Sequence, residues 1–378
     1  MSTPAYPAAR AVAATVEAHF ARHITAAREA GRIDLGPVPD AEAIEAIIDA
    51  AFWASLRREE GVTPTISLAF LPPGHAGQAL TFANRLPLHS APLAKLAPAV
   101  ERPGIHLGVW REDGGLSVWG TTRSIPAFCF VLEVIGSGLL VVKHRSEPFG
   151  KFVNIAVLEG DQVKIVDERS AITPDCPGLL KSLLGASVFS TPGDSLNVLV
   201  HLAASMRAHR RGGALLVVPD DSAVWHDSIV HPITYAVQPQ FSELADLMRR
   251  DAEDRRTHEW QEDLRRTVDA LAGLTAVDGA TVITRSYDLL AFGAKITRRK
   301  SWPQVERVLV TEPIEGQDPQ VVAPSHLGGT RHLSAAQFAQ DQPDALALVA
   351  SQDGRFTVFQ WSTCDSIVHA HRIEALLL

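Results

Sequence analysis

Residues 276–283 read AVDGATVI and residues 328–332 read GGTRH, and these two stretches set the architecture expected for the C-terminal part of the chain. The β-branched run at 281–283 predicts a strand, and Asp278 and Gly279 stand at its mouth, where a metal ion or a hydroxyl group can approach closely. In the second stretch a Gly-Gly pair precedes Thr330, Arg331 and His332 at the start of a helix, which favours an anion such as phosphate. The alternative is an ordinary Asp-Gly turn and a solvated helix start.

Around these stretches, short β-rich runs alternate with helical periodicity. We expect strands at residues 280–284, 288–292, 305–310, 345–350 and 356–361, a helix at 334–340, and two preceding helices at 241–250 and 259–274. The charged segment at 249–256 between those two helices is interpreted as a solvated surface rather than a basic recognition surface. The pattern predicts an α/β domain over residues 241–378.

The first part of the chain predicts a separate α+β domain over residues 1–240. Helices are expected at 8–30 and, capped by Asp40, at 41–56. Strands at 65–71, 105–110, 116–120, 127–135 and 138–143, followed by a hairpin of 152–158 with 162–166, imply an antiparallel sheet. A helix that begins near Ser195 and a strand at 214–218 complete this domain.

Length and composition exclude several classes of protein. With 378 residues, 46% hydrophobic and 21% charged, the chain is too long for one core and too apolar for a disordered protein. The net charge is 35 − 43 = −8, so no global field favours nucleic acid. No apolar run approaches the roughly 20 residues of a membrane span, and the N-terminus does not resemble a signal peptide. We therefore expect a soluble, cytoplasmic protein without membrane or nucleic-acid partners.

Two further motifs favour other chemistry only weakly. Residues 193–196 spell the GDSL motif of a family of esterases, but no Asp-x-x-His pair follows, and Ser195 fits better as a helix N-cap. His369 and His371 would point to one side of a strand, as two metal ligands might, but no third ligand has recognisable spacing.

From about residue 260 onward the chain resembles the diadenylate cyclase domain, whose signature motifs are Asp-Gly-Ala and Gly-Thr-Arg-His-Arg. Asp278, Gly279 and Ala280 match the first motif in full. Residues 329–332 match the second motif up to its last position, which is Leu333 here. Residues 290–296 resemble the family's second strand and adenine-side segment, and residues 345–354 its strand that ends in a serine turn.

The resemblance implies condensation of two ATP into cyclic di-AMP and pyrophosphate, with Mg²⁺ or Mn²⁺ as cofactor. Two protomers of a homodimer or higher oligomer would face each other, so that each ribose 3′-hydroxyl attacks the α-phosphate of the other nucleotide. The resemblance assigns Asp278 as metal ligand and catalytic residue, with Arg331 and His332 as further catalytic residues. The nucleotide-binding residues that it implies are Gly279, Ala280, Gly293, Ile296, Gly329, Thr330 and Ser351. Cyclases of this family commonly carry a variable sensory or regulatory module upstream.

The departure at Leu333 leaves two functions open. An alkyl group in place of a guanidinium removes a charge-assisted contact worth about 1.5 to 3 kcal/mol. Gln352 also stands where some cyclases have glutamate, although Asp353 is adjacent. The chain is therefore interpreted as a diadenylate cyclase with an N-terminal sensory domain, or as a catalytically degenerate sensor that binds an adenine nucleotide.

Overall fold

The computed structural model describes residues 5–58, 61–112, 115–146, 152–172, 176–184, 198–251 and 253–378. It divides the chain into two compact units, one formed by residues 1–166 with Leu378 and the other by residues 167–377. Each unit contains a large mixed sheet, and the described residues form eight α-helices in all. The architecture is therefore mixed α/β in both units.

The sheet of the first unit has eight strands in the order β2-β4-β3-β1-β5-β6-β7-β8. β1 and β3 pair in parallel, whereas the other neighbours are antiparallel, so the expected antiparallel sheet is correct except at this pair. The strands are β1 (Ile66–Phe70), β2 (Leu80–Pro87), β3 (His106–Glu112), β4 (Gly115–Thr122), β5 (Val131–Gly136), β6 (Leu139–Arg145), β7 (Phe152–Glu159) and β8 (Gln162–Ile165). The predicted hairpin of β7 and β8 is confirmed.

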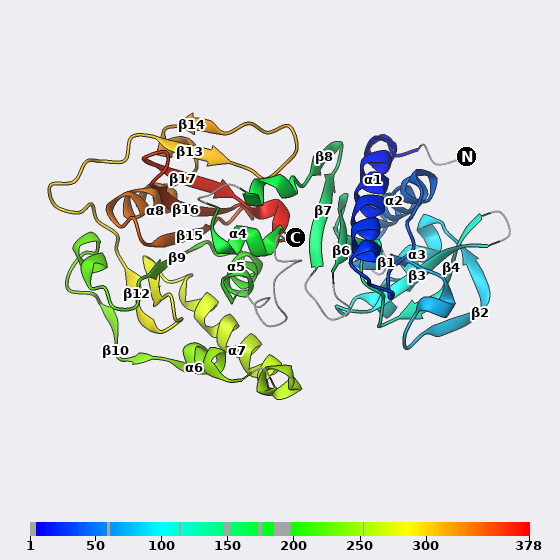
Figure 1. Ribbon diagram of the computed structural model, residues 1–378, viewed down its shortest axis with the longest axis horizontal. Helices are drawn as coiled ribbons and strands as arrows, with labels where there is room; N and C mark the ends of the chain where they lie inside the picture. Colours follow the sequence, from blue (N-terminus) through cyan, green and yellow to red (C-terminus); the bar gives the residue numbers. More distant parts are fainter. Residues whose placement is uncertain are drawn as a thin grey trace. The chain divides into compact units, whose positions relative to one another are not determined.

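Three helices share a hydrophobic core with this sheet: α1 (Pro7–Glu29), α2 (Ala41–Ser55) and α3 (Ser90–Val100). Figure 1 shows α1 and α2 side by side against the strands. Asp40 caps α2 as predicted, because its side chain accepts a hydrogen bond of 2.7 Å from the Ala43 N–H. Helix α3 was not predicted, since Pro92 and Pro98 conceal its periodicity.

The sheet of the second unit has nine strands in the order β10-β12-β11-β9-β15-β16-β17-β13-β14. Parallel pairing joins β9 to β11 and β13 to β17, and the other neighbours are antiparallel. The strands are β9 (Gly213–Val218), β10 (Tyr235–Phe241), β11 (Ala280–Thr284), β12 (Leu289–Ala294), β13 (Val308–Thr311), β14 (Gln320–Val322), β15 (Leu346–Ala350), β16 (Phe356–Ser362) and β17 (Ile367–Arg372). Of these, β10, β14 and β17 were not predicted.

The position of strand β9 shows that the boundary between the two units differs from the predicted one. It lies between β11 and β15 in the second sheet, although the sequence pattern placed residues 214–218 in a first domain that ended at 240. The structure divides the chain at 166/167 instead of 240/241. Apolar periodicity identifies a strand but not the strands with which it pairs, which explains the difference.

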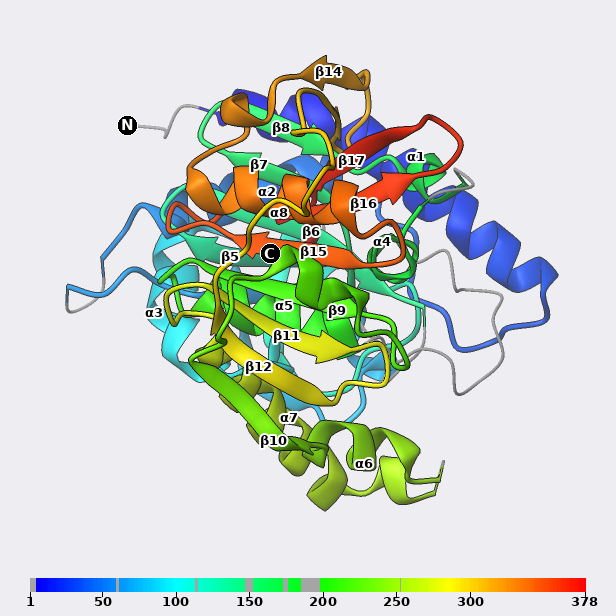
Figure 2. The ribbon, with the colours of Figure 1, turned by 90° about the vertical axis from the view of Figure 1, so that its left-hand side faces the viewer.

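The helices of the second unit are α4 (Gly178–Leu183), α5 (Val198–Ala208), α6 (Glu243–Arg249), α7 (His258–Leu274) and α8 (Thr330–Asp341). Helix α8 packs against β15, β16 and β17 through a core that includes Phe338 and Phe359, and Figure 2 shows it on the near face of the sheet. Helix α5 packs against α7 and β15. The predicted N-cap of α5, Ser195, lies outside the described residues.

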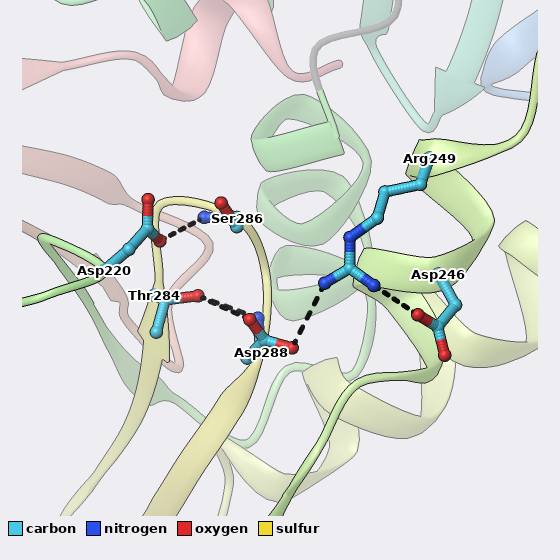
Figure 3. A network of polar contacts seen from close by, with 6 residues as sticks. All are labelled: Asp220, Asp246, Arg249, Thr284, Ser286 and Asp288. Carbon is cyan, nitrogen blue, oxygen red and sulfur yellow. Dashed lines mark hydrogen bonds and ion pairs between the residues drawn. The ribbon is translucent and has the colours of Figure 1, made fainter.

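A polar network fixes the turn between β11 and β12 (Figure 3). The buried Asp288 carboxylate accepts a hydrogen bond of 3.4 Å from the Thr284 hydroxyl and lies 3.9 Å from the Arg249 guanidinium on α6. The Asp220 carboxylate after β9 accepts a hydrogen bond of 2.8 Å from the Ser286 N–H. These contacts hold the two strands in place at one end of the hairpin.

Within the described part of the chain, each helix is too short or too polar to cross a lipid bilayer.

Candidate functional site

One edge of the second sheet collects the ends of four strands and the start of a helix. β9 and β11 begin at this edge, and their antiparallel neighbours β15 and β12 end there. Helix α8 begins beside them and borders a pocket of about 610 Å³. The pocket is lined by Ala214, Asp278, Gly279, Ala280, Ala294, Lys295, Ile296, Gly329, Thr330, Arg331, His332, Ser334, Val349, Ala350, Ser351 and Gln352.

This pocket brings together the site residues expected from the sequence, with one exception. Asp278, Arg331, His332 and the predicted nucleotide-binding residues line it, apart from Gly293. Seven other lining residues were not assigned to the site from the sequence: Ala214, Ala294, Lys295, Ser334, Val349, Ala350 and Gln352. The signal for Lys295 was present, because it stands in the quoted segment 290–296, directly after the apolar strand that ends at the pocket.

Gly293 lies behind the pocket and contacts Gly279. A Cβ atom on Gly279 would stand 2.5 Å from the carbonyl carbon of Gly293, and Gly279 has a φ of +112°. The two glycines therefore let the entry to β11 approach the end of β12. This contact between backbones accounts for both glycines, although Gly279 also lines the pocket.

Three charged side chains, those of Asp278, Lys295 and Arg331, line the pocket and form no ion pairs with one another in the described residues. Asp278 and Lys295 are exposed and Arg331 is half-buried. In the described residues, none of the three side chains takes part in a hydrogen bond or an ion pair. Charged groups gathered in a pocket and left unpaired are typical of a binding site for a charged ligand.

The start of α8 adds backbone N–H groups to this site. Its N-cap is Gly329, which contributes no side-chain cap to the first turn. The Arg331 guanidinium reaches back toward the start of β9, where a Cβ atom on Gly212 would stand 3.0 Å from its Nη1 atom. A helix of this length with an uncapped first turn and a nearby guanidinium favours an anionic group such as phosphate.

His332 is the buried polar group of the site. Its side chain is 3% exposed and packs edge-on to Phe359, with ring centroids 6.1 Å apart. Burial lowers the pKa of His332 below its usual value, so the ring is neutral at pH 7. Its Nε2 atom has no hydrogen-bond partner among the described residues. The Nε2 atom of a neutral imidazole in this position can donate or accept one hydrogen bond with a ligand, according to its tautomer.

Of the residues at and beside the departures from the cyclase motifs, only Gln352 lines the pocket. Leu333 is 36% exposed and does not line the pocket. Gln352 lines it, and its amide donates a hydrogen bond of 3.4 Å to the Arg211 carbonyl. Asp353 forms an ion pair of 3.3 Å with Arg355 and is not a lining residue. Among the described residues, Asp278 thus supplies the carboxylate of the pocket.

The oxygen-bearing side chains of the pocket suit a small, hard divalent cation that prefers oxygen ligands. Mg²⁺ is commonly held by one or two carboxylates together with phosphate oxygens of a substrate, and Mn²⁺ has similar preferences. Asp278 is the carboxylate that could hold such an ion, and the side chains of Thr330, Ser334, Ser351 and Gln352 add neutral oxygen atoms to the pocket lining.

His369 and His371, considered above as a metal pair, lie on β17 with other partners. His369 Nε2 is 2.8 Å from the Asp365 carboxylate, and His371 Nδ1 is 2.7 Å from the Thr311 hydroxyl. Their rings are 5.6 Å apart. The contact of His371 joins β17 to β13, and the contact of His369 joins β17 to the turn that precedes it.

Comparison with known proteins identifies a sensor-like region in the first unit. Residues 33–123 match a family described as the probable sensor domain DACNV. No curated protein matches the chain. Among solved structures, the chain is similar to the hypothetical membrane spanning protein from Bacillus cereus, with 16% identity over 54% of this chain and 84% of that one and a TM-score of 0.28. This likeness is too weak to support an argument about the fold.

Proposed function

We propose that this chain is a diadenylate cyclase, in which the unit of residues 167–377 binds ATP with a divalent cation and the first unit carries a sensor. One observation carries the proposal: a single pocket unites the Asp278 carboxylate with the start of α8 at Thr330, Arg331 and His332. These are the groups that the resemblance to diadenylate cyclases implies for metal and phosphate binding.

The residues of the pocket have distinct tasks in this proposal. Thr330, Arg331 and the first-turn N–H groups of α8 bind the phosphates and stabilise negative charge on the leaving pyrophosphate. Asp278 and Ser351 would hold Mg²⁺ or Mn²⁺, and the bound ion lowers the pKa of the ribose hydroxyl and neutralises phosphate charge. Ile296 and Ala294 provide apolar surface for the base.

The size of the pocket supports a reaction between two protomers. At about 610 Å³ it falls in the range of sites that enclose one ligand of nucleotide size. In this proposal each protomer holds one ATP molecule, and a facing copy of the chain supplies the second. The exposed position of Asp278 and Thr330 at the pocket is compatible with such an encounter.

The match to a sensor domain supports the same class of protein from a separate part of the chain. Residues 33–123 do not overlap the pocket, which is built from residues 214–352. An upstream sensory module is what the resemblance to diadenylate cyclases leads us to expect.

A second candidate, a receptor that binds an adenine nucleotide without turnover, is favoured by specific departures. The pocket has Gln352 where some cyclases have a carboxylate, and Leu333 adds no guanidinium. Thr330 and Arg331, the proposed phosphate-binding side chains, are present in the pocket despite these departures. Binding and turnover must therefore be measured separately.

The test incubates the full chain with ATP and Mg²⁺ or Mn²⁺ and follows cyclic di-AMP and pyrophosphate by mass spectrometry. The comparison uses Asp278→Ala and, as a matched control, Asp318→Ala, whose exposed carboxylate is not among the residues that line the pocket. We expect product from the wild type and the control but not from Asp278→Ala. The rate per protomer should rise with protein concentration, since two protomers must meet.

Two other outcomes would change the conclusion. Bound ATP without product in the wild type would identify a receptor. A wild type that neither binds nor converts ATP, or an Asp278→Ala variant with full activity, would reject the proposed site.

A further inference from the structure

Three histidines of the first unit converge on one point. His19 and His23 are four residues apart on α1 and so lie on one face of the helix, and His144 comes from β6. The ring centroids are 4.3 Å apart for His19 and His23, 5.3 Å for His19 and His144, and 5.5 Å for His23 and His144. One ring nitrogen of each histidine lies within 4.8 Å of those of the other two.

This spacing is close to that of three ligands of one metal ion. Nitrogens about 2.0 to 2.1 Å from a tetrahedral Zn²⁺ are roughly 3.4 Å from one another. The nitrogens already lie within 4.8 Å of one another, so they need to approach by at most about 1.4 Å to reach this separation.

His144 provides an independent sign that a ligand belongs here. Its side chain is 2% exposed, and neither ring nitrogen has a hydrogen-bond partner in the described residues. By contrast His106, another buried histidine of this unit, has its Nδ1 atom 2.7 Å from the Ser67 hydroxyl. A buried polar group without a partner is costly, and a metal ion is a partner that imidazole nitrogens accept.

The surroundings keep these histidines in the form that binds metal. Burial lowers the pKa of His144 to about 3, and it lowers the pKa of His19 to about 2, with further lowering by His144, His23 and Arg22. Both rings are therefore neutral at pH 7 and retain a nitrogen lone pair. The rings of Phe20 and Phe128, 5.8 and 5.0 Å from that of His144, form an apolar wall beside the cluster.

We propose that His19, His23 and His144 form a binding site for a divalent transition-metal ion, with Zn²⁺ as the probe. Imidazole ligands favour zinc, copper, nickel and iron over magnesium or calcium. Three protein ligands leave a coordination position for water or another ligand. A bound ion would link helix α1 to strand β6 within the first unit.

The site is separate from the proposed cyclase pocket and from the sensor match. His19 and His23 precede residues 33–123, and His144 follows them. The cyclase pocket is lined by residues of the second unit, with oxygen groups for a different class of cation. Failure of either proposal therefore leaves the other intact.

The test titrates the full chain, first treated with a chelator and dialysed, with Zn²⁺ in competition with a chromophoric chelator. Co²⁺ is used in parallel, because its visible spectrum reports coordination by nitrogen ligands. The variants are His23→Gln, which alters the half-buried member of the cluster, and His144→Phe, which fits the apolar wall. The matched control is His89→Gln, an exposed histidine of the same unit.

We expect one Zn²⁺ ion per chain in the wild type and in the control. Loss of one ligand should weaken binding at least about 100-fold, beyond the 10- to 100-fold effect of changes around a metal site. Zn²⁺ should raise the melting temperature of the wild type but not of the two cluster variants. Circular dichroism checks that the variants are folded, and if His144→Phe fails to fold, His23→Gln decides the outcome. No binding by the wild type, or wild-type affinity in His23→Gln, would overturn the proposal.

Discussion

Gly279 and Gly293 show how single residues position the backbone next to the pocket. A Cβ atom on Gly279 would meet the backbone of Gly293, and one on Gly293 would stand 2.8 Å from the Tyr235 ring. Tyr235 in turn stacks on Phe292 with ring centroids 4.8 Å apart. The position of Asp278 at the pocket thus depends on two neighbouring residues that lack side chains.

Gly279→Ala should destabilise the protein by about 1 to 3 kcal/mol, because a Cβ atom at this φ is strained and would clash with backbone. The matched control is Gly273→Ala on α7, where nothing lies within 4 Å of the added Cβ atom. In a helix that substitution should be neutral or stabilising by up to about 1 kcal/mol. Urea unfolding of both variants checks the difference, and equal midpoints would contradict this account of Gly279.

Leu333 is the residue at which a gain can be tested. Because its side chain is 36% exposed, Leu333→Arg should leave the fold unchanged. If the added guanidinium contacts phosphate in the transition state, formation of cyclic di-AMP should rise about tenfold to a hundredfold. Leu333→Gln, which is polar but uncharged, is the control. An unchanged rate in Leu333→Arg would refute the proposed effect of this departure.

At the level of elements, the β11–β12 hairpin has a turn held by a polar network at one end and borders the pocket at the other end. The polar network of Figure 3 fixes its turn, and the two glycines fix the opposite ends of its strands. Helix α8 is held on the same sheet by its buried face, so that its first turn borders the pocket. The pocket therefore lies where the open end of this hairpin and the first turn of α8 meet on one sheet.

Asp288→Ala should cost about 1 to 3 kcal/mol of stability, since it removes the acceptor of the buried Thr284 hydroxyl and the charge that faces Arg249. Asp246→Ala is a matched control, because Asp246 pairs with the same Arg249 but both side chains are largely exposed. Its cost should be at most about 1 kcal/mol. Thermal or urea unfolding distinguishes the two, and similar losses would show that burial of Asp288 is unimportant.

At the scale of the whole molecule, both units contain buried histidines that resist protonation: His106 in the first unit, in addition to His19 and His144, and His371 in the second. Burial lowers the pKa of His106 to about 4, with smaller effects of Arg145 and Lys143. Burial also lowers the pKa of His371 to about 3, with a smaller effect of His369. Both units are therefore expected to be sensitive to acid.

Because the unfolded chain binds a proton near pH 6.5 and the folded protein does not, stability should fall as the pH decreases from 6.5 toward 4. The loss is about 1.4 kcal/mol per pH unit for each of the two histidines. Urea unfolding at pH 7 and pH 5 checks this expectation. His106→Gln should reduce the dependence on pH, and an unchanged slope in this variant would show that His106 does not contribute.

Local sequence was sufficient to predict helices such as α2 and α7 and the β7–β8 hairpin, whereas the resemblance to diadenylate cyclases supplied most of the expected site residues that line the pocket. Periodicity, caps, glycine turns and short motifs are properties of a few neighbouring residues, so they can be recognised without the fold. Long-range pairing was decided only in the folded chain, because it depends on contacts between distant segments. That is why β9 joined the second sheet, β1 paired in parallel with β3, and His144 met His19 and His23.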